Sequence, residues 1–136
     1  MDSNFSFDCR VYFEDTDAGG VVYNANYLKF YERARTEYLR SLGFEQDDLL
    51  AQNIVFVVRS IGIDFIKAAR FNEMLRVETQ VGKLKKVSLD FEQAIYCQRE
   101  EKTVLLNKAL VKVACVTADA FSPCAIPGDI VDKLQQ

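Results

Sequence analysis

The chain of 136 residues contains no histidine. Imidazole is the base in Ser-His-Asp and Cys-His catalysis, and hydrolytic zinc sites almost always include a histidine ligand. The absence therefore excludes the first two mechanisms and argues against the third. If the protein hydrolyses a substrate, carboxylates, tyrosines, lysines or backbone groups must carry out the reaction.

Cysteines are few, and long apolar runs are absent. Cys9, Cys97, Cys115 and Cys124 lie far apart without C-x-x-C spacing, which predicts neither a metal knuckle nor a disulfide framework. Reduced thiols that act as small apolar residues fit this pattern best. The first residues, MDSNFSF, lack the basic start and apolar run of a signal peptide, and no stretch approaches ~20 apolar residues. We therefore expect a cytoplasmic protein.

The composition is ordinary for a globular protein, with 49% hydrophobic and 27% charged residues. A length of 136 residues suffices for the core of one domain but not of two, so we expect a single domain over residues 1–136. Lysine and arginine number 17 against 20 aspartates and glutamates, a formal net charge of -3. The overall charge therefore favours neither nucleic acid nor an anionic membrane as a partner.

The first half of the chain predicts one strand and one long helix. After a strand over Cys9–Phe13, apolar residues recur at steps of three and four up to Leu42. Asn24 and Asn26 are both good residues for the N-cap of this helix, and Gly43 is placed to end it. A short helical turn or a second small helix is expected over Glu45–Gln52.

The second half of the chain has the alternating pattern of β-strands. Four strands are predicted: Ile54 to Phe65, Met74 to Lys83, Val87 to Gln98 and Val104 to Val116. In the first of these, one side carries Val55, Val57, Ile61, Ile63 and Phe65, with Arg59 as a polar exception. A strand, a long helix and four strands predict an antiparallel sheet that wraps one helix, an α+β class. The tail from Asp119 is expected to be a short surface extension.

A carboxylate, two glycines and a helix start meet between the first strand and the long helix. Adjacent Gly19 and Gly20 let the backbone take turns closed to other residues and let another molecule approach closely. The free N–H groups and positive dipole end of the helix point back toward Asp17, which favours a developing oxyanion. An aspartate before Ala-Gly-Gly can equally serve to shape the turn or to cap the helix.

The segment EDTDAGGVVYNANYLKFYERARTE closely resembles the signature of the hotdog-fold acyl-CoA thioesterases. The resemblance is to the 4-hydroxybenzoyl-CoA thioesterase-like branch that includes the Tol-Pal-associated acyl-CoA thioesterases, and it covers nearly the whole chain, ending at Ile126-Pro127. It implies a hotdog fold, with an antiparallel sheet wrapped around one long helix, and a homo-oligomer that is a dimer or a dimer-built tetramer. One departure is Asn24, where many members carry a histidine.

The resemblance implies that Asp17, the second aspartate of D-x-D-x-x-G, is the catalytic carboxylate. It would act either as a nucleophile that forms a mixed anhydride or as a general base on water. Backbone N–H groups of Val22, Tyr23 and Asn24 are expected to bind the substrate and stabilise the oxyanion. Coenzyme A leaves as a thiolate and needs no strong general acid. Because coenzyme A is part of the substrate, no cofactor and no metal are expected.

Two further positions have alternative interpretations. Asn24 is either a plain helix cap or an amide that donates a hydrogen bond without changing charge near neutral pH. Lys83, Lys85 and Lys86 form a basic cluster that is either a solvated turn or a contact for the phosphates of coenzyme A.

Other functions compatible with the resemblance are a non-catalytic protein that binds acyl-CoA or acyl carrier protein, and a hotdog dehydratase. The Asn24 departure keeps the first open, whereas the lack of histidine weighs against the second. Acyl carrier protein also stays open as an alternative carrier or partner of a thioesterase.

Overall fold

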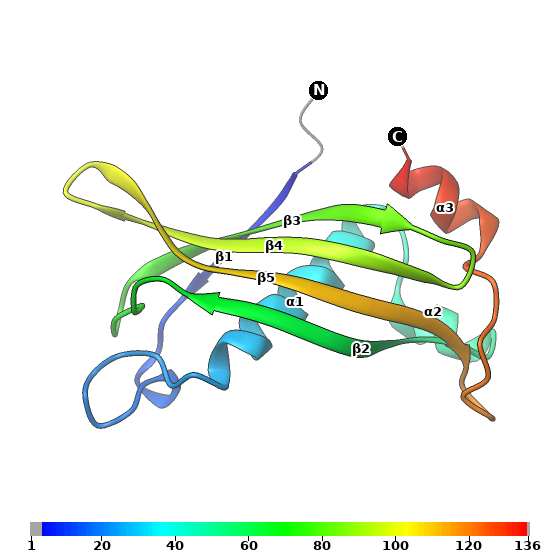
Figure 1. Ribbon diagram of the computed structural model, residues 1–136, viewed down its shortest axis with the longest axis horizontal. Helices are drawn as coiled ribbons and strands as arrows, with labels where there is room; N and C mark the ends of the chain where they lie inside the picture. Colours follow the sequence, from blue (N-terminus) through cyan, green and yellow to red (C-terminus); the bar gives the residue numbers. More distant parts are fainter. Residues whose placement is uncertain (1–3, 136) are drawn as a thin grey trace.

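The computed structural model describes residues 4–135, and its main layer is a five-stranded antiparallel sheet (Figure 1). The spatial order of the strands is β1-β3-β4-β5-β2. Their bounds are Phe5–Arg10 for β1, Ile54–Phe65 for β2, Met74–Leu84 for β3, Ser88–Arg99 for β4 and Lys102–Thr117 for β5. The prediction about a signal peptide concerns in part residues 1–3, which lie outside the described range.

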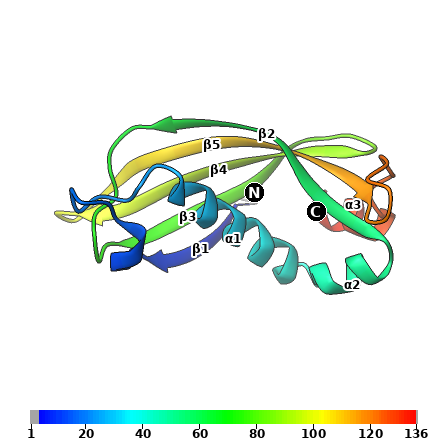
Figure 2. The ribbon, with the colours of Figure 1, turned by 90° about the horizontal axis from the view of Figure 1, so that it is seen from below.

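The long helix α1, Asn26–Ser41, lies across one face of the sheet (Figure 2). Its buried side chains are Tyr27, Phe30, Tyr31, Ala34, Tyr38 and Leu39. They join a core with alternate residues of the central strands, among them Leu75, Val77, Leu89, Phe91, Ile95, Val111 and Val113. The α+β prediction of an antiparallel sheet around one helix is therefore confirmed. No helix within residues 4–135 combines the length and apolar character needed to cross a membrane.

The predicted end of the long helix is confirmed, but neither Asn24 nor Asn26 is its N-cap. Gly43 adopts φ +96°, a left-handed conformation that ends helices, and Gly43 N–H donates to Arg40 O at 2.9 Å. At the other end the N-cap is Ala25, which makes no side-chain cap. Asn26 instead donates from Nδ2 to Asp15 O at 2.8 Å, so its amide ties the helix to the preceding loop.

The first strand begins and ends earlier than predicted. Phe5 and Phe7 already pack against the core, while Ser6 between them is exposed. The strand cannot continue to Phe13 because Asp15 Oδ2 accepts a hydrogen bond from Tyr12 N–H at 2.8 Å. This bond turns the chain into a 3-10 helix, η1, over Phe13–Asp15.

The single apolar side predicted for β2, with Val55 and Val57 beside Ile61 and Ile63, is wrong for the first half of the strand, because the strand contains a β-bulge. Its register with β5 shifts between Val58 and Ser60, which leaves Arg59 as the extra residue. A bulge reverses the side-chain alternation beyond it. The residues that pack on the core are therefore Ile54, Phe56, Ile61 and Ile63.

The tail is not the surface extension predicted from Asp119 onward. It folds back as α3, Gly128–Leu134, and packs on the core through Ile126 and Ile130, which are 5% and 0% exposed. Within the helix, Ile130 and Leu134 are four residues apart and both pack on the core, so one face of this short helix lies against the sheet. The predicted second helix is confirmed as α2, Gln46–Ala51.

Candidate active site

Asp17 lies in a tight loop that joins η1 to α1. The loop is closed by pairing of Thr16 with Val22 and by a hydrogen bond from Asp17 N–H to Val21 O at 2.9 Å. Gly20 adopts φ +80°, which residues with side chains rarely adopt, and donates to Asp17 O at 3.0 Å. The loop therefore has a defined shape that depends on this glycine.

The carboxylate of Asp17 is exposed, and only one of its oxygens is used by the fold. Oδ1 accepts a hydrogen bond from Gly19 N–H at 2.9 Å, so the turn-shaping role considered from the sequence is confirmed. Within residues 4–135 no hydrogen bond reaches Oδ2. A Cβ at Gly19 would lie 3.3 Å from Oδ1, so the glycine leaves room for the carboxylate. Asp17 is thus oriented and still open to a ligand.

Asp15, the other aspartate of the motif, has a structural role that the D-x-D spacing does not reveal. It is only 8% exposed, and its carboxylate accepts from Tyr12 N–H. Its backbone oxygen accepts hydrogen bonds from Tyr23 N–H at 3.0 Å and from Asn26 Nδ2 at 2.8 Å. Asp15 therefore holds the loop against the start of α1 and leaves Asp17 as the exposed carboxylate of the pair.

Of the three predicted oxyanion donors, two are already used within the fold. Val22 N–H donates to Ala69 O at 2.9 Å and Tyr23 N–H donates to Asp15 O at 3.0 Å. Val22 is also only 3% exposed. The prediction is therefore wrong for the N–H groups of Val22 and Tyr23, because strand-like pairing of the loop takes them. The Tyr23 side chain is 56% exposed and remains accessible to a substrate.

The N–H group of Asn24 has no acceptor among residues 4–135, and the same is true of Ala25. Both precede the first turn of α1, where the positive end of the helix dipole lies. Asn24 O accepts from Tyr27 N–H at 3.4 Å, which holds this peptide against the helix. The N–H group of Asn24 is therefore available for the predicted donor role, which stays a prediction, and the N–H group of Ala25 is a neighbouring available donor that sequence reasoning missed.

The tyrosines beneath the loop serve the fold. Tyr27 OH accepts a hydrogen bond from Ala69 N–H at 3.0 Å, and Tyr31 OH donates to Asn107 Oδ1 at 2.6 Å. Burial raises the pKa of both phenols above the ordinary value of 10. Neither hydroxyl is therefore suited to give or take a proton near neutral pH.

The connection between β2 and β3 supports the Asp17 loop from outside. Arg99 donates from Nε and Nη2 to the two carboxylate oxygens of Glu73 at 2.7 and 2.8 Å, and from Nη2 to Ala68 O at 2.7 Å. Glu73 Oε1 also accepts from Arg70 N–H at 2.8 Å. Because Val21 pairs with Arg70, this bidentate ion pair fixes the segment on which the loop rests.

We expect Glu73→Gln to lower the free energy of unfolding by about 1–3 kcal/mol at pH 7. The hydrogen bond from Arg99 lowers the pKa of Glu73 below its ordinary value of 4.5. The stabilisation is therefore complete above pH 4.5 and is lost as the pH falls through the lowered pKa. Urea unfolding at pH 7 and at about pH 3 should show the difference from wild type shrinking on acidification. The matched control is Glu101→Gln in the exposed β4–β5 turn, and an equal loss there would contradict the prediction.

The cysteines are free thiols, and Cys97 and Cys115 lie buried in the core, as predicted for small apolar residues. Burial raises the pKa of Cys9 to about 11 and that of Cys115 to about 12. Thiols with such pKa values are poor nucleophiles at neutral pH. Among residues 4–135 no three Cys, Asp or Glu side chains are grouped as ligands of a metal ion.

The basic cluster of Lys83, Lys85 and Lys86 lies at the turn between β3 and β4, far from the Asp17 loop (Figure 1). The start of β3 pairs with the end of β1 near the loop, and the strand then runs 11 residues, about 35 Å, to the lysines. Within one chain the structure does not bring them to Asp17. Their predicted contact with the same coenzyme A therefore requires a second copy of the chain.

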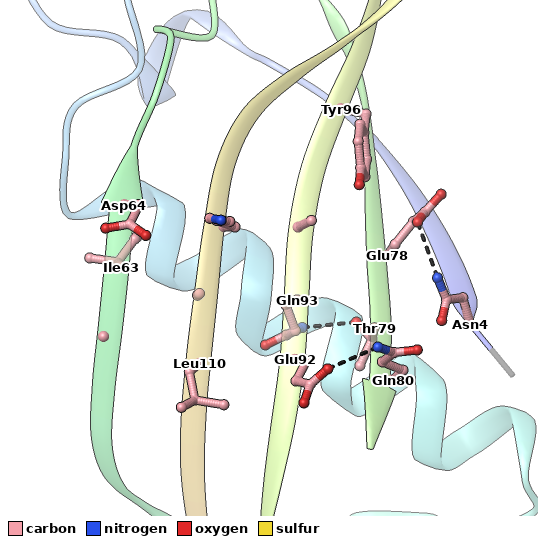
Figure 3. A pocket seen from close by; sticks show the side chains of 14 residues that line it. Asn4, Ile63, Asp64, Glu78, Thr79, Gln80, Glu92, Gln93, Tyr96 and Leu110 are labelled. Atoms are coloured by element: carbon pink, nitrogen blue, oxygen red, sulfur yellow. Dashed lines mark hydrogen bonds between the residues drawn. The ribbon is translucent and has the colours of Figure 1, made fainter. Parts of the chain in front are cut away.

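A separate hollow of about 640 Å³ lies on the face of the sheet opposite α1 (Figure 3). Its lining mixes apolar and polar residues and includes the charged residues Asp64, Glu78, Glu92 and Lys108. Part of this polar surface is hydrogen-bonded to itself, as between Gln80 Nε2 and Glu92 Oε1 at 2.9 Å. Because no residue of the Asp17 loop lines it, this hollow is distinct from the candidate active site.

Comparison with known proteins gives consistent matches over most of the chain. The family model described as "Thioesterase superfamily" matches residues 19–104. "Acyl-CoA thioesterase YbgC" of Haemophilus influenzae is 50% identical over 131 residues, which cover 96% of this chain and 93% of that protein. "Acyl-CoA thioester hydrolase YbgC" of Escherichia coli O6:H1 is 44% identical over 132 residues, with 97% and 96% covered. The crystal structure of a probable thioesterase from Bartonella henselae superposes with a TM-score of 0.82 at 35% identity, covering 92% of this chain and 100% of that one.

Proposed function

Because the chain belongs to the thioesterase superfamily and is 50% identical to an acyl-CoA thioesterase, we infer that it is an acyl-CoA thioesterase. It hydrolyses an acyl-CoA thioester to a free carboxylic acid and coenzyme A. Its antiparallel sheet around α1 is the hotdog fold that the sequence resemblance implied. Asp17 is proposed as the catalytic carboxylate.

One juxtaposition supports this assignment: the exposed carboxylate of Asp17 lies in the loop that leads to the unused N–H group of Asn24. The Asn24 N–H and the positive end of α1 would stabilise the negative charge that develops on the thioester carbonyl oxygen. Asp17 would act on the carbonyl carbon or on water. The carboxylate and the oxyanion donor that a hydrolytic site needs are thus both supplied by one loop.

Two routes fit this geometry. If Asp17 is the general base, it takes a proton from water, the water oxygen bonds to the carbonyl carbon, and the carbon–sulfur bond breaks to release coenzyme A as a thiolate. If Asp17 is the nucleophile, its oxygen displaces the thiolate, and water then hydrolyses the mixed anhydride. A thiol with a reference pKa of about 8.5 leaves without a strong general acid. Neither route requires a cofactor or a metal, and this stays a prediction.

A thiol-release assay over acyl-CoAs with short, long and aromatic acyl groups tests the function. We expect coenzyme A release from at least one of them, undiminished by a metal chelator. Loss of activity in chelator and recovery with added metal would contradict the metal-free mechanism. Tight binding of acyl-CoA without release of thiol from any substrate would favour the non-catalytic alternative.

We predict that kcat varies little between about pH 6.5 and 8.5. The chain has no histidine to titrate in this range, and Asn24 stays uncharged where many relatives of the resembling branch carry an imidazole. The matched variant is Asn24→His, which should introduce an inflection at about pH 6.5. A clear inflection in the wild-type profile, measured by the same thiol-release assay, would contradict this role of Asn24.

We further propose that the protein is a homo-oligomer, a dimer or a dimer-built tetramer. The edge strand β2 supports this, because Val58 and Phe65 are 45% and 52% exposed in the isolated chain. Sedimentation equilibrium measures the mass in solution, and a monomer at micromolar concentration would contradict the proposal. A cytoplasmic location and acyl carrier protein as a partner also remain predictions.

A further inference from the structure

Four cations line a hollow of about 670 Å³ at the end of the sheet that carries the Asp17 loop. They are Lys67, Arg70, Arg99 and Lys102, and Glu100 and Val104 complete the lining. We call this feature the basic hollow. Because the whole chain carries a formal charge of -3, the concentration of positive charge here is local.

The basic hollow adjoins the candidate active site through backbone pairing. Asp17 N–H donates to Val21 O, and Val21 in turn pairs with Arg70. Two steps between neighbouring extended segments place the backbones of Asp17 and Arg70 roughly 10 Å apart. Figure 1 shows the β4–β5 hairpin and the connection between β2 and β3 at the same end of the molecule as this loop.

The cations of the basic hollow differ in how they are engaged. The Arg99 side chain donates hydrogen bonds to Glu73 and to Ala68 O, so it is held in place at one side of the hollow. Lys67, Arg70 and Lys102 are exposed, and none forms a salt bridge with a residue in 4–135. The hollow thus presents three open cations against the single carboxylate of Glu100.

Coenzyme A has the chemistry that such a surface recognises. Its pyrophosphate and 3′-phosphate are separated from the thioester by the uncharged pantetheine arm, so a thioester held at Asp17 leaves the phosphates some distance away. Lysine and arginine bind phosphate oxygens through charge-assisted hydrogen bonds. We propose that the basic hollow binds the phosphates of coenzyme A through Lys67, Arg70 and Lys102. This inference rests on the proposed function and assigns the phosphates to a cluster other than Lys83, Lys85 and Lys86.

The test is charge reversal in the full-length protein. Lys67→Glu, Arg70→Glu and Lys102→Glu should each raise KM for the best acyl-CoA by about three- to tenfold with little change in kcat. With the same acyl group on pantetheine, which lacks the phosphates, wild type and variants should have equal kcat/KM. Lys133→Glu on α3 is the matched control, with the same change in charge outside the hollow and an expected wild-type KM.

Two further measurements separate binding from a structural effect. Adenosine 3′,5′-bisphosphate should inhibit the wild type competitively and the Arg70→Glu variant several-fold more weakly. KM of the wild type should rise with ionic strength, and this dependence should be weaker in the variants because salt screens exposed charges.

Several outcomes would overturn the inference. These are an unchanged KM in all three variants, an equal loss with acyl-pantetheine, or a rise in KM only when Lys85 and Lys86 are reversed. A loss confined to acyl groups carried on acyl carrier protein would assign the hollow to that partner instead. If the wild type hydrolyses no thioester at all, the proposed function is wrong. If it hydrolyses acyl-CoA but the variants keep the wild-type KM, only the phosphate-binding role of the basic hollow is wrong.

Discussion

Replacing Asp17 by asparagine is expected to lower kcat for acyl-CoA hydrolysis by about 10²- to 10⁴-fold, with little change in KM. The amide cannot take a proton from water, and it is a far weaker nucleophile than a carboxylate. Its oxygen still accepts the hydrogen bond that Gly19 N–H donates to Oδ1, so the turn is kept. Because Asp17 is exposed, the free energy of unfolding should change by less than about 0.5 kcal/mol.

This combination separates catalysis from folding in a single variant. The matched control is Glu14→Gln, which removes the charge of an exposed carboxylate in η1 close to the same loop and should keep the wild-type kcat. Thiol release measures kcat, and urea unfolding checks the fold. An Asp17→Asn enzyme with wild-type kcat would rule out Asp17 as the catalytic carboxylate.

The second large effect is expected from Asn24→Pro, which removes a backbone N–H instead of a side-chain group. The N–H of Asn24 has no acceptor among residues 4–135 and is proposed to bind the oxyanion. Loss of one oxyanion donor in other enzymes lowers kcat by about 10²- to 10³-fold. Because proline is tolerated near a helix start, the fold should survive this substitution just before α1.

Two variants control for the side chain and for the neighbouring donor. Asn24→Ala keeps the N–H group and should retain most of the wild-type kcat, so the comparison isolates the donor. Ala25→Pro removes the adjacent N–H at a residue whose φ of -68° suits proline. Circular dichroism and the unfolding midpoint check that both proline variants are folded. A folded Asn24→Pro enzyme with full kcat would show that this N–H is not the oxyanion donor.

Much of the sheet was predictable because its strands follow a simple rule. Leu75 and Val77 in β3, and Leu89 and Phe91 in β4, alternate with polar residues, and in the structure they lie in the core as predicted. The bounds of β2 were predicted, but the core-facing side of its first half was not, because both sides of this strand carry branched apolar residues and the pattern does not show where Arg59 forms the bulge. The bulge is set by pairing with β5, which is 40 or more residues away in the chain.

The candidate site was predictable only in part. The motif marks Asp17, and the structure places this residue exposed in a loop before α1. The same motif does not show that Asp15 is buried and that its carboxylate stabilises the loop by accepting a hydrogen bond from Tyr12 N–H. It also does not show that the N–H groups of Val22 and Tyr23 are taken while that of Asn24 is left open.

The sequence by itself determined the kind of chemistry open to this protein and the class of its fold. Without histidine, any hydrolysis falls to carboxylates, tyrosines, lysines or backbone groups, and the alternation of the strands specifies an antiparallel sheet. Only the tertiary structure decided which backbone donors remain unpaired and which cations gather beside Asp17. Hydrogen-bond partners and charge clusters arise where distant segments meet, as Val22 meets Ala69 and as Lys67 meets Lys102 around the basic hollow. These contacts between residues far apart in the sequence cannot be predicted from a local pattern, because they depend on how all the strands and the helix pack together.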